Sequence, residues 1–295
     1  MSSEVRVALI GLDTSHTIQF AMRAMDPNCA QEQKVTGMKV TSCLRFETPF
    51  QNAQGLDDRQ KQLEGWGIPV TLDFDEAVAG CDAIMLTIND PAYHLPYFVK
   101  CAGLGKPVYL DKPFADTAAN GKAVCKLAAE NGVRMFSCSS LRFAPGLIEA
   151  SAVVPEPKQA SIYGALGTAP AGSSIVWYGC HAFEMLERAM GQGAKSVHAV
   201  PSPCGVVAVV SYESGAQGVV ELIRDCYSYG GSLRARGAEA HYTVDSSRLY
   251  HDQLQLIVDF FHGADAPLTL DESMEVMAML DAAQRSVDSG RAVRL

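Results

Sequence analysis

The sequence lacks the marks of several large protein classes. No apolar run is long enough to cross a bilayer, and the first residues lead into an apolar stretch without a secretory signal pattern. Basic residues are in the minority, with 24 Lys and Arg against 33 Asp and Glu and a net charge of -9. This balance argues against broad affinity for nucleic acid or acidic lipid. We expect a cytoplasmic protein that binds neither nucleic acid nor a membrane.

The nine cysteines include no Cys-x-x-Cys pair and are odd in number. Reduced thiols packed as small apolar side chains explain them best, and neither a disulfide framework nor a metal site is expected. Hydrophobic residues make up 48 % and charged residues 19 % of the chain, which argues against disorder. The 295 residues suffice for two domains with cores of their own.

The first half of the sequence alternates between two kinds of segment. Short apolar runs read as strands at 5–10, 38–44, 70–72, 83–88, 108–110 and 133–137. Helices are predicted between them at 17–25, 75–79, 93–103 and 117–131. Repeated strand–helix units predict a parallel sheet with right-handed crossovers. We therefore expect a Rossmann-like dinucleotide-binding domain over residues 1–139.

The second half changes character near Ser140. Strands are predicted in two pairs, 206–212 with 217–223 and 232–236 with 240–244, each pair joined by a short turn that contains glycine. Their alternation indicates one solvated face. We expect an α+β domain over residues 140–295, with an open, mostly antiparallel sheet that serves substrate binding and oligomerisation and a last helix able to pack back on the first domain.

Lys112 occupies the most informative position in the chain. The strand 108–110 ends in Asp111, Lys112 and Pro113. The proline biases Lys112 toward an extended conformation, so the strand ends abruptly. Open α/β sheets bind ligands at the carboxyl ends of their strands. The pattern favours a lysine that touches a substrate.

The segment from Gly105 to Ala115 resembles the Glu-Lys-Pro signature of the Gfo/Idh/MocA oxidoreductases, with Asp111 in place of the glutamate. Three further segments are similar to family landmarks and follow in the family's order: Asn89-Asp90-Pro91-Ala92-Tyr93-His94, Gly179-Cys180-His181-Ala182-Phe183-Glu184, and 256–295. The resemblance implies an NAD- or NADP-dependent oxidoreductase that acts on a sugar, cyclitol or related hydroxy or keto compound. It also implies a homodimer or homotetramer.

The first strand-to-helix turn departs from the dinucleotide fingerprint Gly-x-Gly-x-x-Gly. It reads Gly11-Leu12-Asp13-Thr14-Ser15-His16, and only the first glycine is kept. On one reading, the helix N-terminus still binds the pyrophosphate through its N–H groups, aided by the hydroxyls of Thr14 and Ser15. On the other, Asp13 or Thr14 caps the helix and occupies those N–H groups itself. The resemblance favours the first reading.

Other cofactor neighbours are implied along the first domain. Arg45 follows the second strand and is a candidate to accept the 2′-phosphate of NADP, although a solvated loop arginine explains it equally well. The resemblance adds Asn89, Pro91 and His94, then Asp111 and Lys112. A lone histidine such as His94 is more often structural.

On the substrate side, the resemblance assigns catalytic roles to Lys112 and His181. The family's aspartate, four residues before that histidine, is Trp177 here, and the adjacent Tyr178 is a candidate proton donor. Arg142, Trp177 and Glu184 are candidate substrate contacts, with core packing or an ion pair as the alternative for each. His181, with an ordinary pKa near neutral, is the expected general acid/base.

Three functions remain open from the sequence, one of them a redox-neutral lyase or hydrolase that keeps a tightly held nicotinamide. The first is hydride transfer, with Lys112 polarising the substrate oxygen. The alternative is a redox-inactive member of the fold that acts as a binding or regulatory protein, which the altered glycine turn and the missing aspartate both favour.

Overall fold

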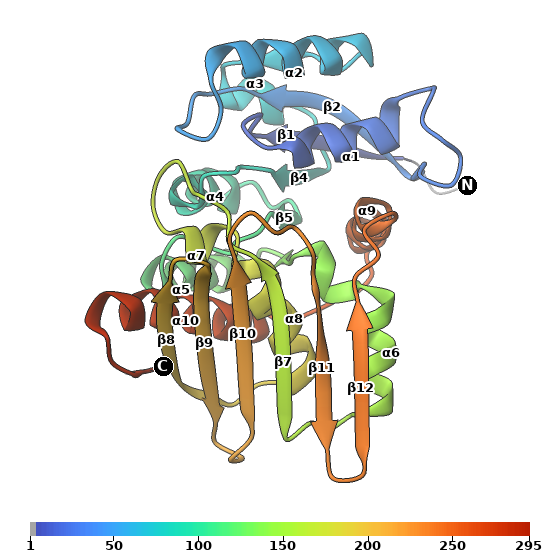
Figure 1. Ribbon diagram of the computed structural model, residues 1–295. Helices are drawn as coiled ribbons and strands as arrows, with labels where there is room; N and C mark the ends of the chain where they lie inside the picture. The colour runs from blue at the N-terminus through green and yellow to red at the C-terminus, as the bar shows by residue number, and fades with distance from the viewer. Residues whose placement is uncertain (1–3) are drawn as a thin grey trace. The chain divides into compact units, whose positions relative to one another are not determined.

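The computed structural model describes residues 4–295 and divides the chain into two compact units (Figure 1). The first unit contains the chain up to Phe114 together with 122–137 and 250–269, and the second contains 115–121, 138–249 and 270–295. The main border thus falls at 137/138, two residues before the expected one. The segment that returns to the first unit contains helix α9, whereas the last helix, α10, stays in the second unit.

The first unit is built on a six-stranded parallel sheet, as predicted. Its strands are β1 (Val5–Ile10), β2 (Met38–Leu44), β3 (Val70–Thr71), β4 (Ala83–Leu86), β5 (Val108–Leu110) and β6 (Met135–Ser137). They lie in the order β3-β2-β1-β4-β5-β6. The order reverses between β1 and β4, and such a reversal opens a crevice at the carboxyl ends of the two strands.

The helices that belong wholly or mainly to the first unit are α1 (Ser15–Met25), α2 (Ala53–Gly65), α3 (Phe74–Val78), the 3₁₀ turn η1 (Pro91–Tyr93), α4 (His94–Ala102), α5 (Ala118–Asn131) and α9 (Leu249–Phe261). Helix α2 was not predicted, because only Leu56 and Leu63 of its thirteen residues are buried. Helix α9 is tied to the sheet by Gln253, whose Nε2 donates to the Tyr109 hydroxyl at 2.8 Å.

The second unit holds a seven-stranded, mostly antiparallel sheet, again as predicted. Its strands are β7 (Gln159–Ala165), β8 (Ala194–Ser202), β9 (Gly205–Tyr212), β10 (Gln217–Ile223), β11 (Gly230–Ala235), β12 (Ala238–Thr243) and β13 (Val293–Arg294). The order is β12-β11-β7-β10-β9-β8-β13, and only β7 and β10 run parallel. Strands β7 and β8 were missed in the sequence.

Helices cover one face of this second sheet (Figure 1). They are α6 (Pro145–Val153), α8 (Cys180–Met190) and α10 (Leu270–Ser289), joined by the short η2 (Ser140–Phe143) and α7 (Ser174–Trp177). Helix α8 buries nearly all of its residues. Val200 of β8 and Val207 of β9 are exposed and pair across the strands. Within residues 4–295, no helix combines the length and apolarity that crossing a membrane requires.

Candidate functional site

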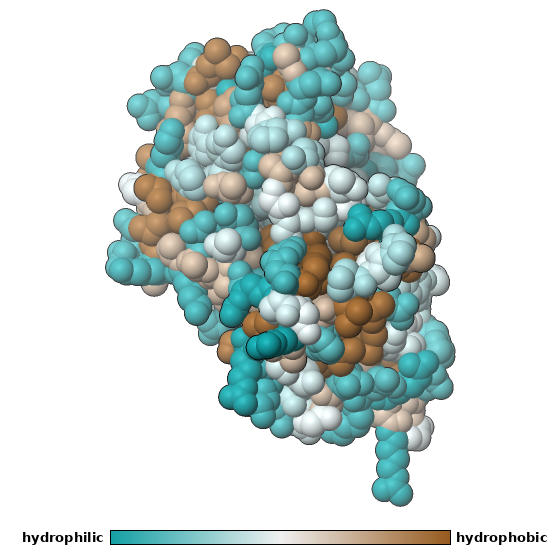
Figure 2. Space-filling model, turned by 60° about the vertical axis from the view of Figure 1, so that its left-hand side comes forward, coloured by the Kyte–Doolittle hydropathy of each residue, from teal (hydrophilic) through white to brown (hydrophobic). Residues whose placement is uncertain are grey.

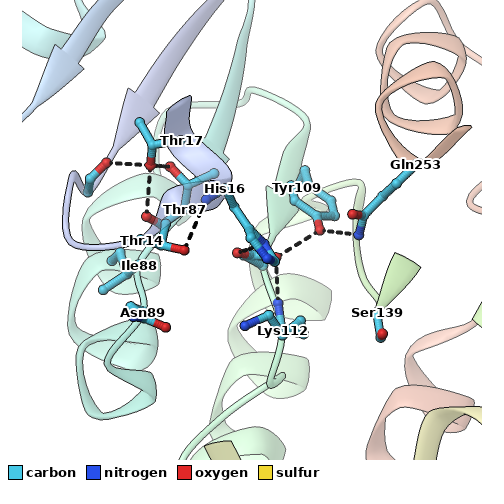
Figure 3. A network of polar contacts seen from close by, with 12 residues as sticks. Thr14, His16, Thr17, Thr87, Ile88, Asn89, Tyr109, Lys112, Ser139 and Gln253 are labelled. Atoms are coloured by element: carbon cyan, nitrogen blue, oxygen red, sulfur yellow. Dashed lines mark hydrogen bonds and ion pairs between the residues drawn. The ribbon is translucent and has the colours of Figure 1, made fainter. Parts of the chain in front are cut away.

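The turn between β1 and α1 depends on Gly11. Its φ of +111° lies in the region that favours glycine, and a Cβ there would lie 2.5 Å from the carbonyl oxygen of Thr87. The loops after β1 and β4 therefore approach each other closely at the point where the strand order reverses. The Thr17 hydroxyl donates to the Gly11 carbonyl at 2.9 Å and also lies 2.9 Å from the Thr87 hydroxyl (Figure 3).

Asp13 turns inward instead of capping the helix. Its side chain is 1 % exposed. Oδ1 accepts from the Asn89 N–H at 2.9 Å, and Oδ2 accepts from the Thr48 hydroxyl at 2.7 Å and, more distantly, from the Asp90 N–H at 3.3 Å. The carboxylate thus ties together the loops that follow β1, β2 and β4. Burial and these hydrogen bonds direct the Asp13 carboxylate into the protein.

Thr14 caps helix α1. Its hydroxyl accepts from the His16 N–H at 3.1 Å, which is the alternative that the sequence left open for this residue. Ser15, the first residue of the helix, is exposed. Because one cap hydrogen bond occupies only the His16 N–H, the helix N-terminus keeps its anion-attracting character.

His16 and Asp111 form a buried pair (Figure 3). His16 Nδ1 lies 2.7 Å from Asp111 Oδ2, and the other carboxylate oxygen accepts from the Tyr109 hydroxyl and the Lys112 N–H. Burial favours the protonated acid, but His16 and Lys112 outweigh it and lower the pKa of Asp111 to about 2. Asp111 is fully buried and supports the Lys112 backbone through the hydrogen bond from the Lys112 N–H.

Lys112 follows this anchored carboxylate at the end of β5. Its side chain is 4 % exposed, and within residues 4–295 its ammonium group makes no hydrogen bond or ion pair. A nearly buried cation without a bound acceptor is costly unless a ligand supplies one. The structure thus leaves the Lys112 ammonium available to an oxygen of a bound molecule.

The buried side chain of His94 fixes the loop after β4. His94 is fully buried, with Nε2 2.8 Å from the Ile88 carbonyl and Nδ1 3.4 Å from that of Phe114. The buried ring of His94 thus links the loop after β4 to the main chain at Phe114. Pro91 is also buried, whereas Asn89 is half-buried beside Asp13.

Arg45 does not stand free after β2. Its guanidinium lies 2.7 Å from Asp57 Oδ1 and donates to Gln60 Oε1, also at 2.7 Å. Arg45 and Gln60 line a surface pocket of about 300 Å³ with Phe46 and Leu72. A 2′-phosphate would have to compete with Asp57 for this arginine.

In the second unit, His181 of α8 is joined to Ser139, which lies just beyond β6. Ser139 Oγ is 2.6 Å from His181 Nδ1, and the Ser139 N–H donates to Glu184 Oε1 at 2.9 Å. All three side chains are at least nine-tenths buried. Glu184 therefore anchors the main chain beside the histidine.

Aromatic side chains surround His181. Tyr178 and Tyr229 meet its ring edge to face, with centroids 5.3 and 5.8 Å away, and Trp177 packs on Tyr178 at 5.0 Å. Burial, with Tyr178 nearby, raises the pKa of Tyr229. Trp177, in place of the carboxylate, is thus one side of an aromatic cluster. Such a cluster suits the apolar face of a ring-shaped ligand.

Arg142 is the centre of a buried ion-pair network. It is 2 % exposed, is paired with Glu187, and has Nη2 2.9 Å from Glu272 Oε1. Burial lowers its pKa, but the surrounding carboxylates raise it further, so the group stays charged. A substrate contact was expected for Arg142, but its guanidinium is already satisfied inside the protein. It fastens η2 to α8 and α10.

Several residues of these arrangements were not singled out from the sequence: Thr48, Tyr109, Ser139, Tyr229 and Gln253. Ser139 had one usable signal, because it follows the carboxyl end of a predicted strand, where ligands gather. The others are polar residues whose partners lie far away in the chain. Within residues 4–295, no group of three or more metal-ligating side chains comes together.

The sequence was compared with models of protein families and with curated proteins. Residues 5–138 match the GFO_IDH_MocA family model, described as an oxidoreductase family with an NAD-binding Rossmann fold. Among curated proteins, no sequence matches the chain.

Solved structures share the fold over nearly the whole length. GenD2 of gentamicin A biosynthesis, in complex with NAD, is 17 % identical with a TM-score of 0.81, covering 100 % of this chain and 97 % of that one. The Lactobacillus casei scyllo-inositol dehydrogenase with NAD(H) and scyllo-inositol is 14 % identical, with a TM-score of 0.79 and 99 % coverage of both chains. An Agrobacterium radiobacter oxidoreductase with NAD⁺, L-tartaric acid and magnesium is 13 % identical with a TM-score of 0.75, covering 99 % of this chain and 98 % of that one. At these identities the likeness shows the fold.

Proposed function

We propose that the chain is an NAD-dependent oxidoreductase of the Gfo/Idh/MocA type, acting on a sugar, cyclitol or related hydroxy or keto compound. The match of residues 5–138 to the model of an oxidoreductase family with an NAD-binding Rossmann fold supports this proposal. The observation that carries the proposal is Lys112. Its ammonium is nearly buried and unpaired within residues 4–295, at the end of a strand where this fold binds ligands.

The residues of the first unit fit a dinucleotide. Gly11 gives the tight turn, and the N-terminus of α1 supplies N–H groups for a pyrophosphate. The carboxylate of Asp13 would oppose a phosphate if it faced outward. Here it is buried, and protein donors already satisfy both of its oxygens. The exposed Ser15 and the N–H groups of the first helical turn are the proposed pyrophosphate contacts.

We propose NAD and not NADP as the preferred cofactor. Arg45, the residue suited to a 2′-phosphate, is held by Asp57 and Gln60. Two acidic residues lie near Arg45: Asp57, its ion-pair partner, and Glu47, which lines the same pocket. Their negative charges would repel the 2′-phosphate of NADP. A ribose hydroxyl, which carries no charge, meets no such repulsion.

Bound NAD(H) would supply the hydride, and the protein's task is to orient the substrate and manage the charge on its oxygen. The Lys112 ammonium is proposed to bind that oxygen and to exchange a proton with it. An ammonium stabilises the negative charge that develops as the carbonyl becomes an alkoxide. Asp111 keeps the Lys112 backbone in place through its hydrogen bond to the Lys112 N–H.

Within the second unit, His181 and the aromatic cluster beside it are proposed to contact a sugar or cyclitol. Tyr178, Trp177 and Tyr229 offer aromatic rings to a sugar or cyclitol, whose C–H faces pack on such rings. Tyr178 remains the candidate proton donor.

Calorimetric titration with NAD(H) and NADP(H) tests the proposal. We expect NAD(H) to bind with micromolar affinity and NADP(H) more weakly. Absorbance of NADH can then be followed against a panel of polyols, aldoses and keto acids. If neither dinucleotide binds at millimolar concentration, the oxidoreductase proposal fails and the alternative, a redox-inactive binding protein, takes its place.

A further inference from the structure

Ser139 is rigidly placed beside His181. The 2.6 Å contact joins Ser139 Oγ to His181 Nδ1, and Ser139 is fully buried. Its main chain is fixed on both sides: the N–H donates to Glu184 Oε1, and the carbonyl accepts from the Arg142 N–H at 3.2 Å. These backbone hydrogen bonds, which do not involve His181, therefore fix the position of the Ser139 hydroxyl beside the imidazole.

The direction of the proton follows from the other bond to the hydroxyl. The Leu141 N–H donates to Ser139 Oγ at 3.1 Å, so one lone pair of this oxygen is already occupied. The hydroxyl has a single proton to give, and within residues 4–295 its hydrogen bonds offer one acceptor, His181 Nδ1. If Nδ1 carried a proton instead, Oγ would accept twice, and a buried O–H would be left without a partner. Such groups are rare because an unmade buried hydrogen bond is costly.

We infer that Ser139 is a positioning residue that holds His181 as a neutral imidazole with its proton on Nε2. In a neutral imidazole one ring nitrogen donates and the other accepts, so an accepting Nδ1 fixes Nε2 as the donor. The edge contacts of Tyr178 and Tyr229 confine the ring in that orientation. This assignment depends on the second unit alone.

The catalytic consequence rests on the proposed function. His181 then donates a hydrogen bond through Nε2 to the substrate oxygen and does not remove a proton from it. A neutral imidazole can stabilise charge on a carbonyl oxygen in this way without changing its own protonation. The site thus favours a substrate whose reacting oxygen accepts hydrogen bonds, as a carbonyl does.

Nitrogen NMR of the full-length protein, labelled with ¹⁵N-histidine, tests the inference without any cofactor. The chain has seven histidines, and the His181 signals are identified by their loss in His181→Gln. We expect an unprotonated Nδ1 and a protonated Nε2 at neutral pH. In Ser139→Ala, the His181 ring signals should move to values averaged over the two tautomers. Ser139→Thr should restore the signals of the single tautomer. Ser140→Ala, the matched neighbouring substitution, should leave the spectrum unchanged.

Kinetics give the second readout. Ser139→Ala should lower kcat by about ten- to a hundredfold, less than the loss on removing a preorganised donor outright, with no change in the Kd of NAD(H). Ser139→Thr should recover most of the rate. A protonated Nδ1 in the wild-type spectrum overturns the inference even if every variant fails to fold, as does a Ser139→Ala spectrum identical to wild type. If His181 carries its proton on Nε2 but the protein binds no dinucleotide, the proposed function is wrong. The tautomer assignment is then still correct.

Discussion

His16 Nδ1 lies 2.7 Å from Asp111 Oδ2. One residue stands where the dinucleotide fingerprint has its third glycine, and the other stands where the lysine-proline signature has its glutamate. The two departures are therefore partners: the imidazole fills the space at the start of α1 and meets the shorter carboxylate at the end of β5. Each unusual residue accounts for the other, and both lie next to the backbone of Lys112.

Asp111 makes the unfolding free energy of the protein depend on pH in the acid range. Its pKa falls from 3.8 to about 2 on folding, which is equivalent to about 2 kcal/mol. Because the folded pKa is depressed, this contribution is complete above about pH 4 and is lost as the pH falls toward 2. We expect Asp111→Asn to be less stable than wild type at pH 7 by about this amount, with the gap closing near pH 2, in urea unfolding followed by circular dichroism.

Asp82→Asn is the matched control for this experiment. The pKa of Asp82 is also lowered, by hydrogen bonds from Arg6, but the pair is exposed and screened by solvent. Its substitution should change the acid dependence much less. An Asp111→Asn variant with the same pH profile as wild type would show that His16 does not hold the carboxylate ionised.

Gly11→Ala should impair both folding and cofactor binding. The new Cβ would lie 2.5 Å from the Thr87 carbonyl oxygen at a φ of +111°, so the turn must shift. We expect a loss of roughly 2 kcal/mol or more in unfolding free energy and no measurable NAD(H) binding by calorimetry. Gly65→Ala, in α2 with open space around its Cβ, should fold and bind normally. Unimpaired binding by Gly11→Ala would remove the turn from the cofactor site.

The sheets were predictable, whereas the contacts at their ends were not. Continuous apolar runs such as 7–10 and 108–110 mark strand segments buried on both faces, and the run is visible in the sequence without knowledge of the packing. Helix α2 was not predicted because most of its residues are polar and only two apolar side chains are buried. The inward turn of Asp13 depends on Asn89 and Thr48, and the return of α9 depends on Gln253 meeting Tyr109. Those partners are set by the tertiary fold, and no periodicity in the sequence encodes them.

The same reason limits what a sequence motif can say about individual site residues. A sequence motif identifies a position but not the direction of its side chain. His94 and Arg142 occupy the expected positions, yet their polar groups are satisfied by carbonyls and carboxylates inside the protein. Ser139 shows the converse, because an ordinary serine gains its significance from the histidine that α8 brings beside it.

Cofactor preference should depend on the Arg45–Asp57 ion pair. Asp57→Asn removes the carboxylate that holds the guanidinium, so Arg45 becomes available to a 2′-phosphate. We expect NADP(H) to bind about three- to tenfold more tightly than to wild type, with NAD(H) nearly unchanged, since an ion pair with a half-exposed partner is weak. Adding Arg45→Ala should cancel the gain. Equal changes for both cofactors would show that Arg45 does not read the 2′ position.

The uncovered face of the second sheet predicts self-association. Val200 and Val207 are 53 % and 43 % exposed and are direct cross-strand neighbours. Figure 2 shows apolar patches of this kind between polar side chains on one side of the molecule. We expect a homodimer or homotetramer by light scattering, and Val207→Lys should shift it toward monomer because it places a charge in the apolar face.

Val153→Lys serves as its control, since Val153 is 60 % exposed on helix α6 and not on the sheet. This variant should keep the wild-type mass. A wild-type monomer at every working concentration contradicts the expected assembly.

Lys112 should matter more to turnover than to cofactor affinity. A cation that meets the substrate oxygen stabilises mainly the charge of the transition state, so its loss lowers kcat. We expect Lys112→Ala to reduce kcat by roughly two to four orders of magnitude, with the Kd of NAD(H) within about twofold of wild type. Lys106→Ala, which removes a neighbouring lysine before β5, should leave both unchanged. Steady-state rates on the substrate found by screening, together with calorimetry, separate the two effects. Near-wild-type turnover in Lys112→Ala would make this lysine a structural residue, and a parallel loss of cofactor affinity would make it part of the NAD site instead.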